Sequence, residues 1–66
     1  MLIKKDNIII NLDNVKEICL DGYNNNEIIF MFNDRTQKDI YVQDRNKVFN
    51  DIIVNYNSGK KVYEIG

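Results

Sequence analysis

The spacing of apolar residues changes near residue 44, and this change limits the folds that the chain can adopt. Downstream of that point apolar residues recur at positions i, i+1, i+4, i+5 and i+8, which are Val48, Phe49, Ile52, Ile53 and Tyr56. At 100° per residue they fall within an arc of about 140°, as on one face of a helix. Asp44 can cap the start of this helix, and Gly59 can supply the left-handed residue that follows its end. The pattern predicts a helix over residues 45–57.

Upstream of the helix the apolar residues form short runs separated by Asn, Asp and Gly. These runs cover residues 8–10, 15–20, 27–32 and 39–42, and they are rich in β-branched and aromatic residues, as is typical of strands. Residues 33–36 begin with Asn and Asp, which suits a type I turn and predicts a hairpin. Residues 2–4 and 62–65 are two further candidate strands.

These elements predict the fold class and the domain organisation. We expect one α+β domain over residues 1–66. It comprises an antiparallel β-meander of four to five strands, one amphipathic helix and a short C-terminal strand.

The size of the chain favours association with another subunit. A domain of 66 residues buries only about 60% of the surface that its unfolded chain exposes. Cys19 is the single cysteine, so no intramolecular disulfide can form, and no Cys/His cluster predicts a metal or a cofactor. Because small domains that lack disulfides and bound metals often gain stability by oligomerising, we expect a homo-oligomer.

The central hairpin is apolar on both faces, since alternate residues of a strand point to opposite sides. One face is a seat for the helix and carries Ile28, Phe30, Phe32, Ile40 and Val42; the other carries Ile29, Met31 and Tyr41. One helix covers only one face, so either a second copy of the chain or the terminal segments must cover the other. We predict a subunit interface formed by Ile29, Met31, Tyr41 and Val54, the last being the one apolar residue on the polar side of the helix.

The chain lacks the residue types that nucleophilic catalysis needs. It has no histidine, and Ser58 and Thr36 are each the only residue of their kind and fall at a helix end and in a turn. Cys19 lies inside a strand-like run, where a buried structural thiol is the ordinary outcome. Residues 21–27 are rich in oxygen ligands but lack the spacing of a calcium loop, so we interpret them as a polar connection. We predict no enzyme activity, no catalytic residues and no metal site.

The charges do not demand a nucleic-acid partner. The net charge is −1 and the basic residues are interleaved with acids, whereas a phosphate-binding surface needs clustered Lys and Arg. An alternative hypothesis is a single-stranded nucleic-acid-binding module that stacks bases on exposed tyrosines between basic residues. Its candidate residues are Tyr41, Tyr63, Arg35, Lys38, Lys60 and Lys61, with Tyr23 as a further aromatic.

The remaining expectations concern location, source and function. No stretch approaches the roughly 20 apolar residues of a membrane span, and the first residues carry no apolar signal region, so we expect a cytoplasmic protein. Asn, Ile and Lys have AT-rich codons, and their enrichment favours a bacterial or phage source. The leading hypothesis is a small non-enzymatic interaction protein that binds a macromolecular partner as an oligomer, such as an inhibitor of a host defence system. A third hypothesis is a protein that sequesters a nucleotide-like ligand between subunits.

Overall fold

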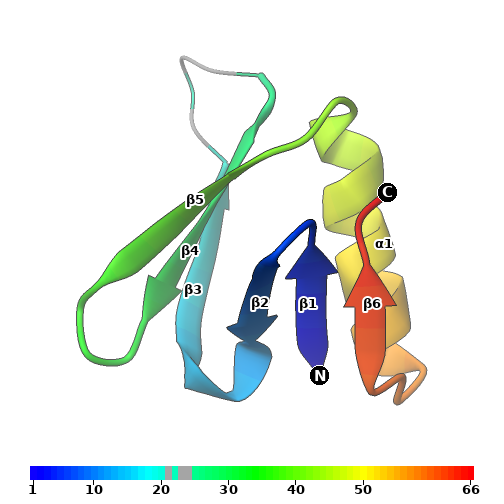
Figure 1. The fold of residues 1–66 in the computed structure, drawn as a ribbon, viewed down its shortest axis with the longest axis horizontal. Helices are drawn as coiled ribbons and strands as arrows, with labels where there is room; N and C mark the ends of the chain where they lie inside the picture. Colours follow the sequence, from blue (N-terminus) through cyan, green and yellow to red (C-terminus); the bar gives the residue numbers. More distant parts are fainter. Residues whose placement is uncertain (21, 23–24) are drawn as a thin grey trace.

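A computed structural model describes residues 1–20, 22 and 25–66. In chain order the elements are β1 (Leu2–Lys5), β2 (Ile8–Asn11), the 3₁₀ helix η1 (Leu12–Asn14), β3 (Val15–Leu20), β4 (Glu27–Phe32), β5 (Gln37–Tyr41), α1 (Arg45–Asn57) and β6 (Val62–Glu64) (Figure 1). The predicted α+β class is confirmed, with five strands before the helix and one short strand after it. The bounds of α1 are those that the apolar spacing predicts.

The strands form two three-stranded sheets instead of one continuous meander. Sheet A has the order β2-β1-β6 and sheet B the order β3-β4-β5. Sheet B is antiparallel, whereas β6 pairs parallel with β1, so that Leu2 lies opposite Val62. The break falls at η1, where the Asn11 side chain accepts a hydrogen bond from the Asp13 amide at 3.0 Å. This turn separates β3 from β2 and thereby divides the meander into two sheets.

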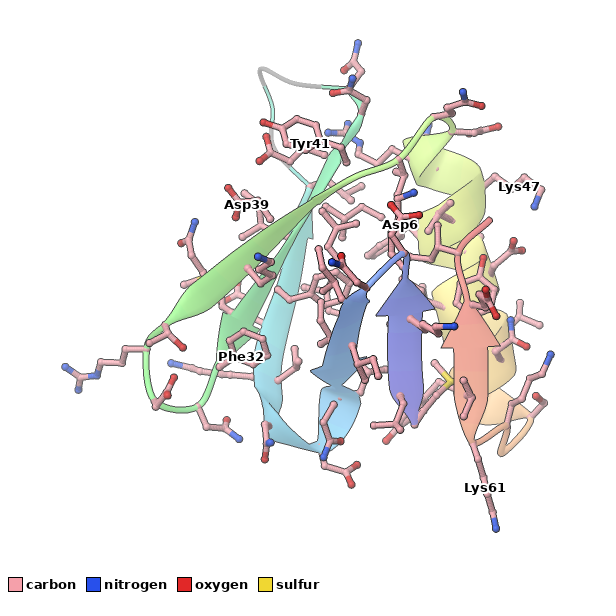
Figure 2. The ribbon with its side chains drawn as sticks, in the orientation of Figure 1. Asp6, Phe32, Asp39, Tyr41, Lys47 and Lys61 are labelled. Carbon is pink, nitrogen blue, oxygen red and sulfur yellow. The ribbon has the colours of Figure 1, made fainter. Side chains whose placement is uncertain are left out.

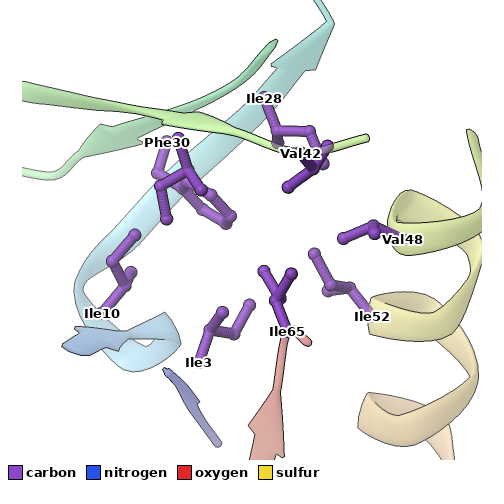
Figure 3. Packing of buried hydrophobic residues seen from close by; sticks show 9 residues of the cluster. Ile3, Ile10, Ile28, Phe30, Val42, Val48, Ile52 and Ile65 are labelled. Atoms are coloured by element: carbon purple, nitrogen blue, oxygen red, sulfur yellow. The ribbon is translucent and has the colours of Figure 1, made fainter. Parts of the chain in front are cut away.

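One hydrophobic core lies between the two sheets and the helix (Figure 3). Sheet A contributes Ile3 and Ile10, together with Ile65, whose amide donates to the Lys4 carbonyl at 2.8 Å. Sheet B and the segment that follows it contribute Ile28, Phe30, Ile40 and Val42, and α1 contributes Val48 and Ile52. Full burial stabilises the fold by about 1.5–3 kcal/mol for each large apolar side chain. The core therefore holds all three layers together.

The hairpin between β4 and β5 turns at the predicted residues 33–36. The Arg35 amide donates to the Phe32 carbonyl at 3.0 Å, and the Phe32 amide donates to the Thr36 carbonyl at 2.8 Å. The Thr36 hydroxyl and amide both donate to Oδ1 of Asp34, at 2.6 and 3.0 Å. Arg35 has a φ of 73°, so its backbone lies in the left-handed region that favours glycine. A type I turn followed by one left-handed residue is a common hairpin connection.

The helix begins and ends at the residues that the sequence indicates, but only part of its apolar stripe is buried. Oδ1 of Asp44 accepts a hydrogen bond from the Lys47 amide at 3.2 Å, and Gly59 has a φ of 76°. Ile52 is buried, whereas Ile53 and Tyr56 remain 44% and 60% exposed. These two exposed side chains lie on the flank of α1 that faces β3.

Candidate interaction surfaces

The outer face of sheet B carries three of the four residues predicted to form an interface. The pairing register places Ile29 and Met31 of β4 and Tyr41 of β5 on the side opposite the buried Ile28 and Phe30. Ile29 and Met31 are half-buried and Tyr41 is exposed. The same face also includes Glu17, Cys19, Gln37 and Asp39.

The terminal segments do not cover this face. Ile3 and Ile65, which flank the two termini, lie in the core on the other side of sheet B (Figure 3). Cover by the terminal segments, one of the two alternatives from the sequence, is therefore wrong for the part of the chain that the structure describes. Val54 is exposed on the side of α1 opposite the buried Val48 and Ile52. The core thus separates Val54 from Ile29, and the predicted interface residues do not form one surface.

Cys19 is a half-buried thiol with two polar or polarisable neighbours. Its Sγ donates to Oε1 of Glu17 at 3.4 Å and lies 4.0 Å from Sδ of Met31. Burial raises the pKa of the Cys19 thiol, and the hydrogen bond to Glu17 and the charge of that carboxylate raise it further. Because the thiolate is the reactive form, this environment favours a structural thiol.

A mainly apolar groove of about 290 Å³ runs between β3 and α1. Its apolar lining comes from η1, from β3 and from the helix, and β3 also contributes two charged residues. The lining residues are Leu12, Val15, Lys16, Glu17, Ile18, Ile52, Ile53 and Tyr56. The sequence pattern assigns Ile53 and Tyr56 to the buried stripe, so it does not reveal this groove. The apolar stripe spans about 140° of the helix surface, and the sheets do not cover all of it, since Ile53 and Tyr56 stay exposed. The width of the stripe is the one sequence feature that indicates an exposed flank.

The hydrogen bonds between β4 and β5 fix the direction in which each residue of β4 points. The Phe32 amide donates to the Thr36 carbonyl, and the Val42 amide donates to the Asn26 carbonyl at 2.7 Å. The direction alternates along an antiparallel strand. The even-numbered residues of β4 therefore bond to β5, and the odd-numbered residues bond to β3.

The same alternation leaves one edge of β3 open beside the groove. Ile29 of β4 lies opposite Cys19, so Cys19 bonds to β4 and its neighbours Ile18 and Leu20 direct their amide and carbonyl groups away from it. No further strand pairs with β3 among the described residues, because sheet B ends there. Ile18 also lines the groove. Unpaired backbone groups and an apolar hollow thus occur at the same place.

The two edges of sheet B differ in chemistry. The β5 edge carries Lys38 and Asp39, and charged side chains are a usual protection of an edge strand against pairing. The β3 edge carries its two charges, Lys16 and Glu17, in its first half, and Ile18, Cys19 and Leu20 follow them in succession. An apolar open edge favours the addition of another strand, so the second half of β3 is the segment of this sheet edge that suits strand addition.

The residues of the nucleic-acid hypothesis are dispersed. Tyr41 lies on sheet B and Lys61 lies beyond the helix at the opposite end of the molecule (Figure 2). Tyr63 is half-buried, and its hydroxyl donates to Asp51 at 3.2 Å. Arg35 lies in the β4–β5 turn, and the register places Lys38 on the face opposite Tyr41. Tyr23 falls outside the described residues. The structure does not bring these candidates together into one stacking surface.

Two other hypotheses have only partial counterparts in the structure. Tyr56, Lys60 and Lys61 line an open hollow of about 360 Å³, which has the residue types expected for a nucleotide-like ligand. Asp13 also lines this hollow, at 3.9 Å from the terminal ammonium of Met1, and its carboxylate would oppose a phosphate. The segment considered as a calcium loop includes residues 21, 23 and 24, which lie outside the described part of the chain.

Neither a metal cluster nor a membrane-spanning helix occurs in the described regions. Across residues 1–20, 22 and 25–66, no three Cys, Asp or Glu side chains are grouped so that they could hold a metal ion. Within the same residues, α1 is the only α-helix, and it is too short and too polar to cross a membrane.

In comparisons with known proteins, no family model, no curated protein and no solved structure matches this chain.

Proposed function

We propose that this protein is a non-catalytic protein-binding module that captures an extended segment of a partner protein as an added strand on β3. The observation that carries this proposal is the coincidence of the open β3 edge with the apolar groove beside α1. Ile18 supplies backbone groups to the edge and a side chain to the groove. In strand addition, main-chain hydrogen bonds give affinity, and pockets for alternate side chains give specificity.

The geometry defines the chemistry of the captured segment. An added strand would continue sheet B past Ile18 and Leu20 and exchange hydrogen bonds with their outward amide and carbonyl groups. Every second side chain of that strand would then point into the groove, against Ile53 and Tyr56. The segment should therefore be extended and should alternate apolar with polar residues. Capture of this kind requires no covalent step. It therefore suits an inhibitor of a host defence protein, the example given in the sequence analysis.

The test uses a displayed library of random dodecapeptides selected against the whole protein. Selected peptides should alternate apolar and polar residues, and their affinity is measured by fluorescence polarisation. The key variant is Ile53→Lys, which places an ammonium in the groove, and the matched control is Val54→Lys on the outward side of the same helix. We expect Ile53→Lys to weaken binding at least about tenfold, which corresponds to about 1.4 kcal/mol, and Val54→Lys to leave it unchanged.

Hydrogen exchange provides a second readout that does not depend on a substitution. The amides of Ile18 and Leu20 should exchange rapidly in the free protein, because no strand pairs with that edge, and should become protected when a selected peptide binds. Equal affinity of the Ile53→Lys and Val54→Lys variants would contradict the proposal. So would a bound peptide that leaves these two amides unprotected.

A further inference from the structure

The outer face of sheet A is the most exposed apolar sheet surface among the described residues. Three large aliphatic side chains lie on it, with Leu2, Ile9 and Val62 exposed by 38%, 64% and 47%. The register places Leu2 between Asn11 and Val62 on neighbouring strands. Aliphatic residues with such exposure on one small sheet are typical of an interaction surface.

This face also carries charges of both signs. Lys4 lies between Ile9 and Glu64 in the next row of the sheet, and its Nζ is 3.9 Å from Oε1 of Glu64. Both side chains are exposed, so each can make further contacts. The face therefore has one row of Asn11, Leu2 and Val62 beside a second row of Ile9, Lys4 and Glu64, which ends in a positive and a negative charge.

The outer face of sheet B has a different charge pattern. The register places Glu17 and Asp39 on either side of Ile29 and Met31, and it places neither Lys nor Arg on that face; Lys16 falls at the bulge, outside the register. A second copy stacked on this face would bring carboxylates toward carboxylates, and like charges across an interface are unfavourable. Charge complementarity thus favours sheet A over sheet B as the surface for self-association.

We propose that a second copy of this chain binds the outer face of sheet A about a two-fold axis that lies between β1 and β6 and runs parallel to them. This axis places Leu2 on Val62 of the partner subunit and Lys4 on Glu64 of the partner subunit, and the symmetry repeats both contacts. Each charge then meets its opposite and Leu2 meets Val62, whereas Ile9 on the outer strand β2 lies outside these paired contacts. None of these residues lines the groove between β3 and α1, so the dimer leaves the proposed strand-binding site open.

The small size of the face sets the strength of the dimer. Stable interfaces bury about 1,600 Å² in total, and three short strands offer less than that. We expect a weak dimer that forms at roughly 0.1–1 mM protein. Sedimentation equilibrium over that range should show the average mass rising from monomer toward dimer.

Charge exchange tests the proposed symmetry. Lys4→Glu makes both charges of the face negative, and Glu64→Lys makes both positive, so each variant alone should dimerise at least about tenfold more weakly than the wild type. An equimolar mixture of the two variants should restore dimerisation to within about threefold of the wild type, because the mixed pair is again complementary. Restoration by mixing cannot arise from misfolded variants, and it excludes an effect confined to the Lys4–Glu64 pair within one chain.

Tyr41→Lys on the outer face of sheet B is the control, because Tyr41 is exposed and the substitution is on the other sheet. This variant should dimerise like the wild type. A wild-type protein that stays monomeric at 1 mM, or a mixture that stays monomeric, would overturn the proposal. Dissociation caused by Tyr41→Lys but not by the charge variants would assign the dimer to sheet B instead.

Discussion

The hydroxyl of Tyr63 donates a hydrogen bond of 3.2 Å to Oδ2 of Asp51, and the same oxygen accepts from Nζ of Lys47 at 2.9 Å. Tyr63 belongs to β6 and Asp51 to α1, so this pair ties the last strand to the helix. The Lys47 hydrogen bond lowers the pKa of Asp51, and the bond from Tyr63 lowers it further. Burial, followed by the charge of Asp51, raises the pKa of Tyr63.

The first prediction concerns the acid stability that Asp51 provides. Because its pKa is lower in the folded protein than in the unfolded chain, the ionised carboxylate stabilises the fold. This contribution is complete above the ordinary aspartate pKa of about 3.9 and is lost as the pH falls below it through the folded value. Urea unfolding of the wild type and Asp51→Asn between pH 2 and pH 7 should show a shallower acid loss in the variant. Lys47→Met removes the largest cause of the shift and should behave similarly; an acid profile identical to the wild type in both variants would refute the assignment.

The second prediction separates two adjacent residues of α1. Ile52 is 2% exposed in the core, whereas Ile53 is on the groove flank. Truncating Ile52 to Ala should destabilise the protein by about 2–5 kcal/mol, because a cavity remains in the core beside Val48 and Ile65. Ile53→Ala should cost less than about 1 kcal/mol. Thermal unfolding of the two variants measures the difference, and similar melting temperatures would mean that α1 is rotated from its described position.

Local signals in the sequence explain why α1 and the central hairpin could be predicted. Asp44 marks the start of the helix with a capping side chain and Gly59 marks its end with a left-handed backbone, and the turn after β4 begins with residues that favour it. The alternation of Ile28 and Ile29 also gives the inner and outer faces of β4 correctly. In each case the information lies within a few residues of the structure that it specifies.

The two-sheet arrangement could not be predicted, because it depends on contacts between distant residues. The residues of β6 carry no feature that identifies β1 as the strand with which β6 pairs. The run Ile8, Ile9, Ile10 does not alternate apolar with polar residues, so it does not show which side faces inward. In the structure Ile10 is buried and Ile9 is exposed. The candidate surfaces were hidden for the same reason, since the groove and the outer face of sheet A both arise from how distant elements pack.

The third prediction concerns the backbone at Arg35. Its φ of 73° costs an ordinary residue roughly 1–2 kcal/mol, a cost that glycine avoids. Arg35→Gly should stabilise the protein by about 0.5–1 kcal/mol, since glycine also increases the entropy of the unfolded chain and so offsets part of the gain. Arg35→Ala keeps the strain and should bring no such gain. Urea midpoints of the three proteins decide the matter; a less stable glycine variant would show that the Arg35 side chain itself stabilises the turn.

The fourth prediction concerns the reactivity of Cys19. Because burial and Glu17 raise its pKa, alkylation by iodoacetamide at pH 8 should be slower than that of a free cysteine. Glu17→Gln removes the negative charge and should speed the reaction at the same pH. Cys19→Ser should still bind the selected peptides. Loss of binding by a well-folded Cys19→Ser protein would show that the thiol contributes to recognition.

The parallel pairing of β1 with β6 also fixes the order in which the molecule can be completed. Leu2 pairs with Val62, so almost the whole chain separates the two partners, whereas each pairing in sheet B joins strands that are neighbours in sequence. Contacts between neighbouring segments close short loops and form early, and contacts across a long loop form late. During synthesis, β3, β4 and β5 can associate while β1 and β2 wait as a hairpin for their third strand. Until β6 leaves the ribosome, the edge of β1 that β6 occupies remains unpaired and is open to other chains. The interval in which β1 can associate wrongly therefore ends only when Val62, Tyr63 and Glu64 have left the ribosome.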